Sequence, residues 1–314
     1  MENEKLNKII EVARLYYQLD YSQQEIAKKL DVSRPTVSRL LKQAKESGIV
    51  EIKIHNPVEA GALLTEQLKM KFGLKEVVVA SVSEYDSALI KRQLGEVAAN
   101  YLNKVVKDHD VIATSWGTTV YELATKLKTK PVSQTTVVQL NGGVSHSETK
   151  TYASEIIHLF GEAYNTQTFL LPLPAIVDHI VVKQAIEADR HIRKILDLGK
   201  QANIAIFSVG TPVLDSVLLQ AEYFSMDDQH LIQSKAVGEI CSRFFDKNGE
   251  ICVENLNSRT IGIELDELAK KEKSILVAGG PKKLEAIYGA LKGKYANVLI
   301  TDEHTASLLI EMDY

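Results

Sequence analysis

The apolar positions of residues 1–50 recur at the three- and four-residue spacing of amphipathic helices. Segments 6–19, 23–30 and 34–47 show this pattern. The apolar stripe of the first segment consists of Ile9, Val12, Ala13, Tyr16 and Leu19. The apolar face of the third segment consists of Val37, Leu40, Leu41 and Ala44. The pattern therefore predicts three short helices.

Polar residues mark where the second and third helices begin. Ser22 is a good N-cap, and Glu25 three residues later completes a capping box. Ser33 follows a short turn and caps the third helix, in which Pro35 is tolerated because an N–H in the first turn has no helical partner. Helix, tight turn and capped helix is the pattern of a helix-turn-helix.

The third helix starts with arginines and short polar groups, which suit base edges and phosphates. The predicted DNA-binding residues are Lys28, Ser33, Arg34, Thr36, Ser38, Arg39 and Lys42. Residues 49–54 resemble a strand and predict a β wing. The alternative is an ordinary three-helix bundle with solvated lysines. Because cap, turn, proline and polar face agree in spacing, we expect residues 1–54 to form a winged helix-turn-helix domain.

Beyond a break at residues 55–61, which predicts a linker, apolar strands alternate with helices. The expected strands are residues 76–82, 111–116, 135–140, 166–173, 203–210, 274–280 and 297–302. This alternation is typical of a mainly parallel sheet covered on both faces. We therefore expect residues 62–314 to form a large α/β effector domain, whose ligand would bind at the carboxyl ends of the strands.

Glycines and small polar residues follow several of these strands. Gly117-Thr118-Thr119 combines free backbone N–H groups and two hydroxyls at a helix start, which suits a phosphate. Such a turn can also cap a helix without a ligand, but several such loops on one sheet favour a shared crevice. The candidate effector-binding residues are Gly117, Thr118, Thr119, Asn141, Gly142, Gly143, Pro174, Gly210, Glu239 and Lys283.

Other polar residues have more than one interpretation. Lys283 would supply positive charge to a phosphate. Glu239 could accept hydrogen bonds from sugar hydroxyls or be a surface carboxylate, and Arg259 could be a structural ion-pair partner. Trp116 would pack beside the phosphate loop or line the pocket. The histidines form no metal-binding pair, so we expect no metal and no cofactor.

Charge differs between the two regions. The chain has 314 residues and a net charge of −4, yet residues 1–56 hold 10 basic against 8 acidic residues. This small difference suits a head that meets phosphates. Cys241 and Cys252 suggest no disulfide framework, and no apolar run reaches the ~20 residues of a membrane span. These features favour a cytoplasmic protein without a membrane partner.

Together the motifs resemble the SorC family of bacterial sugar-responsive regulators. The matching segments are YSQQEIAKKLDVSRPTVSRLLKQAKESGIV, SWGTT, QLNGG, LPLP, AVGEICSRFFD, RTIGIEL and AGGPKKLEAIYGAL. The resemblance implies an effector domain similar to sugar-phosphate isomerases and deaminases. It also implies a homo-oligomer, either a dimer or a tetramer, that binds a palindromic double-stranded DNA operator. A phosphorylated sugar would release the protein from this operator.

An active isomerase or deaminase with a DNA-binding appendage is one alternative, and a protein-interaction module whose head binds no DNA is a weaker one. No acid/base pair follows the strands, so we expect no enzyme, and the basic, capped third helix argues against the interaction module.

Asn141 departs from the pattern of the most similar family members, which regulate deoxyribonucleoside catabolism. They carry a lysine directly after the Gln-Leu pair, and it forms a Schiff base with deoxyribose 5-phosphate. An amide nitrogen is not a nucleophile and cannot form an imine. The resemblance therefore implies a non-covalently bound deoxyribose 5-phosphate or a related sugar. Another phosphosugar or phosphopolyol, from a different carbohydrate pathway, is the alternative.

Overall fold

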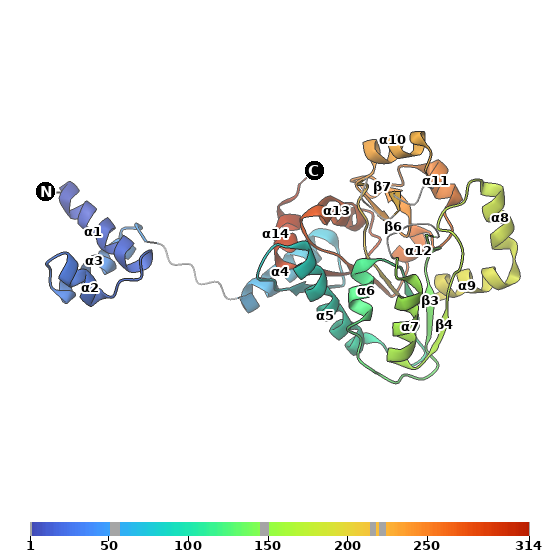
Figure 1. Ribbon diagram of the computed structural model, residues 1–314, viewed down its shortest axis with the longest axis horizontal. Helices are drawn as coiled ribbons and strands as arrows, with labels where there is room; N and C mark the ends of the chain where they lie inside the picture. Colours follow the sequence, from blue (N-terminus) through green and yellow to red (C-terminus); the bar gives the residue numbers. More distant parts are fainter. Residues whose placement is uncertain (1, 51–56, 145–150, 214–217, 220–223, 314) are drawn as a thin grey trace. The chain divides into compact units, whose positions relative to one another are not determined.

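The computed structural model describes residues 2–50, 57–144, 151–213, 218–219 and 224–313. Its chain divides into two compact units, Met1–Asn56 and Pro57–Tyr314 (Figure 1). Each unit has its own hydrophobic core, as the patterns along the chain require.

The first unit contains helices α1 (Glu2–Tyr17), α2 (Gln23–Lys29) and α3 (Arg34–Glu46). Its core includes Ile9, Val12, Ala13, Leu15, Ile26, Val37, Leu40, Leu41 and Ala44. Leu19 was expected in this stripe, but that expectation is wrong, because α1 ends at Tyr17 and Leu19 is 60% exposed. Leu15, which lies within the helix, is buried instead.

Both expected caps are present in this unit. The Ser22 N–H donates to the Glu25 carboxylate at 2.8 Å, and the Glu25 N–H donates to Ser22 Oγ. Ser33 Oγ accepts from the Thr36 N–H at the start of α3. Residues 51–56, which hold most of the expected wing and the start of the expected linker, lie outside the described residues.

The second unit begins with helix α4 (Pro57–Phe72), so residues 57–61 of the expected linker are helical. Proline suits a first helical turn because its φ is already close to helical. Within the described residues, a seven-stranded sheet has the order β1-β9-β8-β5-β2-β3-β4, and its neighbouring strands are parallel. The strands are β1 Glu76–Ala80, β2 Val111–Thr114, β3 Thr136–Gln139, β4 Gln167–Phe169, β5 Ile204–Phe207, β8 Lys273–Val277 and β9 Val298–Asp302. The predicted α/β class is confirmed.

Helices cover both faces of this sheet, because successive strand residues point to opposite sides. The helices of this unit after α4 are α5 Ser87–Val105, α6 Thr118–Ala124, α7 Ala153–Tyr164, α8 Ile180–Ala188, α9 Arg190–Gln201, α10 Met226–Lys235, α11 Glu254–Arg259, α12 Leu265–Ala269, α13 Leu284–Lys292 and α14 Glu303–Glu311, with a 3-10 turn at Pro281–Lys283. In β5, Ile204 and Ile206 join a core with α5, α6 and α7, whereas Ala205 and Phe207 join a core with α4, α13 and α14 (Figure 1).

A hairpin of β6 (Gly238–Ile240) and β7 (Arg243–Phe245) was not among the expected strands. Its two turn residues, Cys241 and Ser242, have φ values of 52° and 69°. Such tight turns usually carry Asn-Gly or Asp-Gly, so this one had no recognisable sequence signal. The hairpin matters because it carries Glu239.

Candidate functional site

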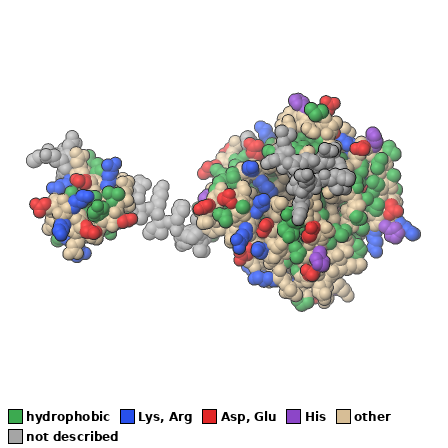
Figure 2. All heavy atoms as spheres, viewed as in Figure 1, with side chains coloured by type: hydrophobic (Ala, Val, Ile, Leu, Met, Phe, Trp, Pro, Cys, Tyr) green, Lys and Arg blue, Asp and Glu red, His purple; other side chains and the backbone are tan. Residues whose placement is uncertain are grey.

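The predicted DNA-binding residues lie on the solvent side of the first unit. Arg34, Ser38, Arg39 and Lys42 are exposed on α3, and the opposite face of this helix packs into the core. Lys28 is exposed on α2. Figure 2 shows Lys and Arg side chains on the visible surface of this unit.

The side chains of Ser33 and Thr36 form hydrogen bonds at the start of α3. Their hydroxyl oxygens lie 2.8 Å apart, and Ser33 also accepts from the Thr36 N–H. Of the predicted set, Arg34 and Arg39 therefore combine exposure with forked donors that can reach base edges and phosphates.

The second unit contains a cavity of about 370 Å³ where strands β2, β5 and β8 end. We call it the strand-end cavity. Its described lining comprises Ser87, Lys91, Trp116, Gly117, Thr118, Thr119, Ser208, Val209, Gly210, Thr211, Val213, Leu218, Glu239, Phe244, Gly279, Gly280, Lys282 and Lys283. Six of the predicted effector residues belong to it: Gly117, Thr118, Thr119, Gly210, Glu239 and Lys283.

Lysines and hydroxyl groups meet in one part of this cavity. Lys283 Nζ lies 3.2 Å from Ser208 Oγ and 3.4 Å from Thr119 Oγ1. Lys91 Nζ lies 3.4 Å from Thr118 Oγ1. Burial lowers the pKa of Lys283 to about 8, and the neighbouring charge of Lys91 acts in the same direction. Such an arrangement is suited to an anion.

Glu239 is the carboxylate of the cavity lining. Its Oε2 accepts from the Ser242 N–H at 2.7 Å, and its backbone pairs with Gly210. Burial raises the pKa of Glu239, against the smaller effects of the Ser242 hydrogen bond and the Lys283 charge. A Cβ at position 210 would lie 2.1 Å from Glu239 Oε1, so the glycine, which has no Cβ, leaves room for the carboxylate.

Asp302 holds the glycine loop after β8, and sequence reasoning did not single it out. This buried residue ends β9 and caps α14, and its Oδ2 accepts from the Gly280 N–H at 3.0 Å. A Cβ at Gly279 would lie 2.2 Å from the same oxygen. An aspartate that ends an apolar strand before a helix was the available signal.

Asn141, Gly142, Gly143 and Pro174 do not belong to the described lining of the strand-end cavity. Asn141 pairs with Gly262 and Gly143 with Pro174, in short bridges. Asn141 is 1% exposed, and its Oδ1 has no hydrogen-bond partner among the residues that the structure describes. The Trp116 Nε1–H donates to the Gly142 carbonyl at 2.7 Å, which links this segment to the cavity wall. Ligand contact by these four residues stays a prediction.

Several lining residues escaped sequence reasoning. Lys91 lies within the long helix α5, where a lysine side chain is usually expected to be exposed to solvent. Phe244 lies in the β6–β7 hairpin, which was not among the expected strands.

Arg259 is a structural ion-pair partner. Its guanidinium lies 3.1 Å from the carboxylate of Asp228, and both side chains are nearly buried.

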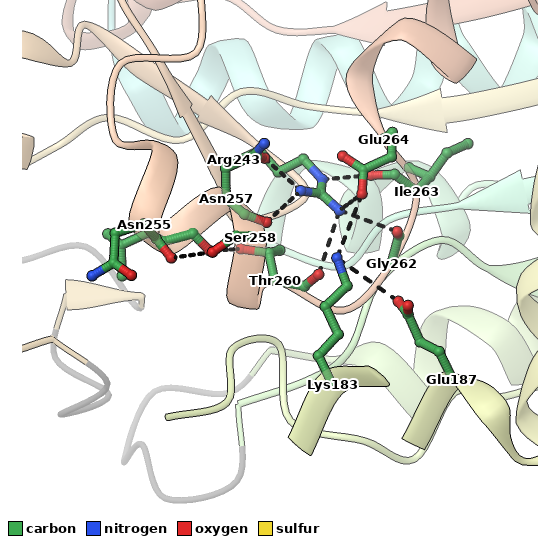
Figure 3. A network of polar contacts seen from close by, with 11 residues as sticks. Lys183, Glu187, Arg243, Asn255, Asn257, Ser258, Thr260, Gly262, Ile263 and Glu264 are labelled. Atoms are coloured by element: carbon green, nitrogen blue, oxygen red, sulfur yellow. Dashed lines mark hydrogen bonds and ion pairs between the residues drawn. The ribbon is translucent and has the colours of Figure 1, made fainter. Parts of the chain in front are cut away.

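Arg243 anchors the segment that runs from Asn257 to Glu264 (Figure 3). Its fully buried guanidinium donates to Glu264 and to the carbonyls of Asn257, Thr260, Gly262 and Ile263. Lys183 of α8 lies 3.6 Å from the same Glu264 carboxylate. Because Gly262 pairs with Asn141, this network fixes the backbone around Asn141.

In the part of the chain that the structure describes, no helix is both long and apolar enough to cross a membrane. Nor do histidine, cysteine and acidic side chains gather there in threes to hold a metal ion.

A helix-turn-helix unit followed by an α/β unit with an anion-suited cavity defines a ligand-responsive DNA-binding regulator. Comparisons with known proteins agree. Residues 8–51 match the model of a homeodomain-like domain, and residues 56–311 match that of a sugar-binding domain. The chain belongs to the SorC family of sugar-binding transcription regulators.

The similar proteins extend over nearly the whole chain. A deoxyribonucleoside regulator of Bacillus subtilis is 50% identical over 99% of each chain. The sorbitol operon regulator of Klebsiella pneumoniae is 34% identical over 99% of this chain and 100% of the relative. The crystal structure of full-length SorC from that organism matches with a TM-score of 0.74 and 32% identity, over 98% of this chain and 99% of that one. These relatives are regulators, which supports a regulator rather than an enzyme.

Proposed function

We propose that this protein represses genes of deoxyribonucleoside or sugar catabolism and leaves its operator when a phosphorylated sugar binds. The main support for this proposal lies in the strand-end cavity, where two lysines contact three hydroxyl groups. The lysines are Lys91 and Lys283, and the hydroxyls belong to Thr118, Thr119 and Ser208. Cations and hydroxyl donors together suit the three acceptor oxygens of a phosphate group. Deoxyribose 5-phosphate is the proposed ligand, because the 50% identical relative is named a deoxyribonucleoside regulator.

The sugar would be held by hydrogen bonds alone. Glu239 Oε1 faces Gly210 beside the cavity and can accept from sugar hydroxyls. Asn141 has no nucleophilic nitrogen, so it cannot form an imine with an aldehyde. Its buried Oδ1, which has no partner among the described residues, would instead accept from a hydroxyl donor. A phosphosugar or phosphopolyol of another pathway is the second candidate, since a 34% identical relative is named a sorbitol operon regulator.

DNA would be bound through Arg34 and Arg39, supported by Lys28, Ser38 and Lys42. Helix-turn-helix proteins read palindromic sites in pairs, so we propose a homo-oligomer, dimer or tetramer, acting in the cytoplasm. Ligand can weaken this complex only by binding the DNA-free state more tightly than the DNA-bound state. We propose release as the direction because the family resemblance implies it.

Fluorescence anisotropy with a labelled promoter fragment from beside the protein's own gene tests the proposal. The full-length protein should bind this fragment, and deoxyribose 5-phosphate should lower its affinity, whereas inorganic phosphate should not. A Lys283→Met variant should bind DNA but not respond. Specific DNA binding that no phosphosugar or phosphopolyol changes would contradict the sensor assignment, and absence of DNA binding would contradict the regulator assignment.

A further inference from the structure

Besides its lysines and hydroxyl groups, the strand-end cavity is lined by large apolar side chains. Trp116, Leu218 and Phe244 line the cavity, and Trp116 packs against the hydrophobic cluster that contains Leu218 and Phe244. Leu218 and Phe244 are 4% and 3% exposed. We call these three residues the apolar wall.

The apolar wall offers no hydrogen bond to a ligand. The indole nitrogen of Trp116 already donates to the Gly142 carbonyl at 2.7 Å. Phe244 packs edge-on against Phe224, with ring centroids 5.8 Å apart, which fixes the orientation of its ring. Among the described lining residues, Glu239 is a carboxylate that can accept from sugar hydroxyls; the other polar side chains outside the lysine and hydroxyl group are those of Ser87, Thr211 and Lys282.

A hydroxyl placed against such a wall would lose its hydrogen bonds with water and gain none. A buried, unsatisfied polar group of this kind weakens binding by roughly 5- to 150-fold. A carbon that carries only hydrogens would instead gain favourable burial against the rings. Such a wall would therefore favour a sugar that carries no hydroxyl on the carbon facing it.

We propose that the apolar wall of Trp116, Leu218 and Phe244 is the specificity determinant of this sensor and selects a phosphomonoester of a deoxy sugar. The lysines hold the phosphate, and Glu239 accepts from a remaining hydroxyl. The deoxygenated carbon C2 lies against the wall. This inference rests on the proposed function, because it assigns selectivity within the same cavity.

Isothermal titration of the full-length protein with 2-deoxyribose 5-phosphate and ribose 5-phosphate tests the proposal, since the two differ by the C2 hydroxyl alone. The deoxy sugar should bind at least about tenfold more tightly. Equal affinities, or a preference for ribose 5-phosphate, would overturn the wall as determinant but leave the sensor function intact. Failure of both sugars to bind would contradict the proposed deoxypentose ligand as well.

Variants assign the selectivity to the wall. Phe244→Tyr adds one hydroxyl to the wall and Trp116→Gln adds an amide, so both should reduce the preference toward equality. Phe169→Tyr, a ring outside the described cavity lining, is the matched control and should keep the wild-type ratio. Two readouts guard against misfolding: the melting temperature, and the affinity for 2-deoxyribose 5-phosphate itself. An unchanged ratio in both folded wall variants would contradict the proposal.

Discussion

Lys283 Nζ lies 3.2 Å from Ser208 Oγ, so the loops that follow the neighbouring strands β8 and β5 meet through a lysine and a hydroxyl. Lys283 also reaches Thr119 after β2, on the other side of β5. Three strand ends thus converge on one ammonium group.

Replacing Lys283 by methionine should abolish the ligand response without unfolding the protein. The ammonium is buried at a cost, as its lowered pKa indicates, so an apolar side chain of similar length should be tolerated. Titration calorimetry should show at least about tenfold weaker phosphosugar binding, because a charge-assisted contact is lost. The melting temperature of the ligand-free variant should equal or exceed that of the wild type. Wild-type affinity in this variant would place the phosphate elsewhere.

Ligand affinity should fall as the pH rises through about 8. A lysine is charged below its pKa, so Lys283 attracts a phosphate dianion at pH 7 and loses that attraction above about pH 8. The decline should approach at most about tenfold per pH unit, the limit for one linked proton. Lys91 and Glu239 act on the same ammonium, with opposite effects. Lys283→Arg is the matched variant: an arginine stays charged, so calorimetry should show no such decline.

Gly210→Ala should impair ligand binding more than folding. The new methyl group would lie 2.1 Å from Glu239 Oε1, so the carboxylate would have to leave its position. Because this carboxylate is the flexible end of a side chain, we expect little loss of stability and at least about fivefold weaker binding of the sugar, the effect of one lost hydrogen bond. Gly61→Ala in α4 is the control, since its Cβ would meet nothing within 4 Å and the residue lies outside the described cavity lining. Equal affinities of the two variants would exclude a role of Glu239 in binding.

Arg34→Ala and Arg39→Ala should each weaken operator binding while leaving the ligand affinity unchanged. Both side chains are exposed on α3, so their removal should not disturb the core. A guanidinium on a base edge contributes roughly 1–3 kcal/mol. Anisotropy with operator and scrambled DNA separates base reading from phosphate contact, because loss of a phosphate contact weakens both equally. Lys270→Ala, an exposed residue of the second unit, is the charge control.

The helices of the first unit and the strands of the large sheet were predictable from the sequence because their signals are local. Serine caps and apolar spacing located α2 and α3, and apolar runs located the strands of the large sheet. Gly117, Thr118 and Thr119 could be assigned to the cavity because the carboxyl ends of parallel strands lie on one edge of a sheet.

The remaining parts depend on contacts between distant segments. Lys91 reaches the cavity only because α5 packs beside α6, and no local pattern distinguishes it from a solvated lysine. Asn141 follows β3 as expected, yet its pairing with Gly262, more than a hundred residues later, buries it. The β6–β7 turn uses Cys241 and Ser242 at positive φ, so the hairpin had no local signal.

Asn141→Lys should create a covalent sensor. The residue after Asn141, Gly142, accepts from Trp116 of the cavity wall. Asn141 itself pairs with Gly262, whose carbonyl accepts from Arg243. A lysine side chain is longer than that of asparagine and carries the nucleophilic amine that an imine requires. Incubation with deoxyribose 5-phosphate and borohydride should then give a mass adduct at position 141, and the wild type should give none there. Because the phosphate must bind first, the adduct should be lost in the Asn141→Lys, Lys283→Met double variant. An adduct that persists in the double variant, or none in the single one, would separate Asn141 from the phosphate cavity.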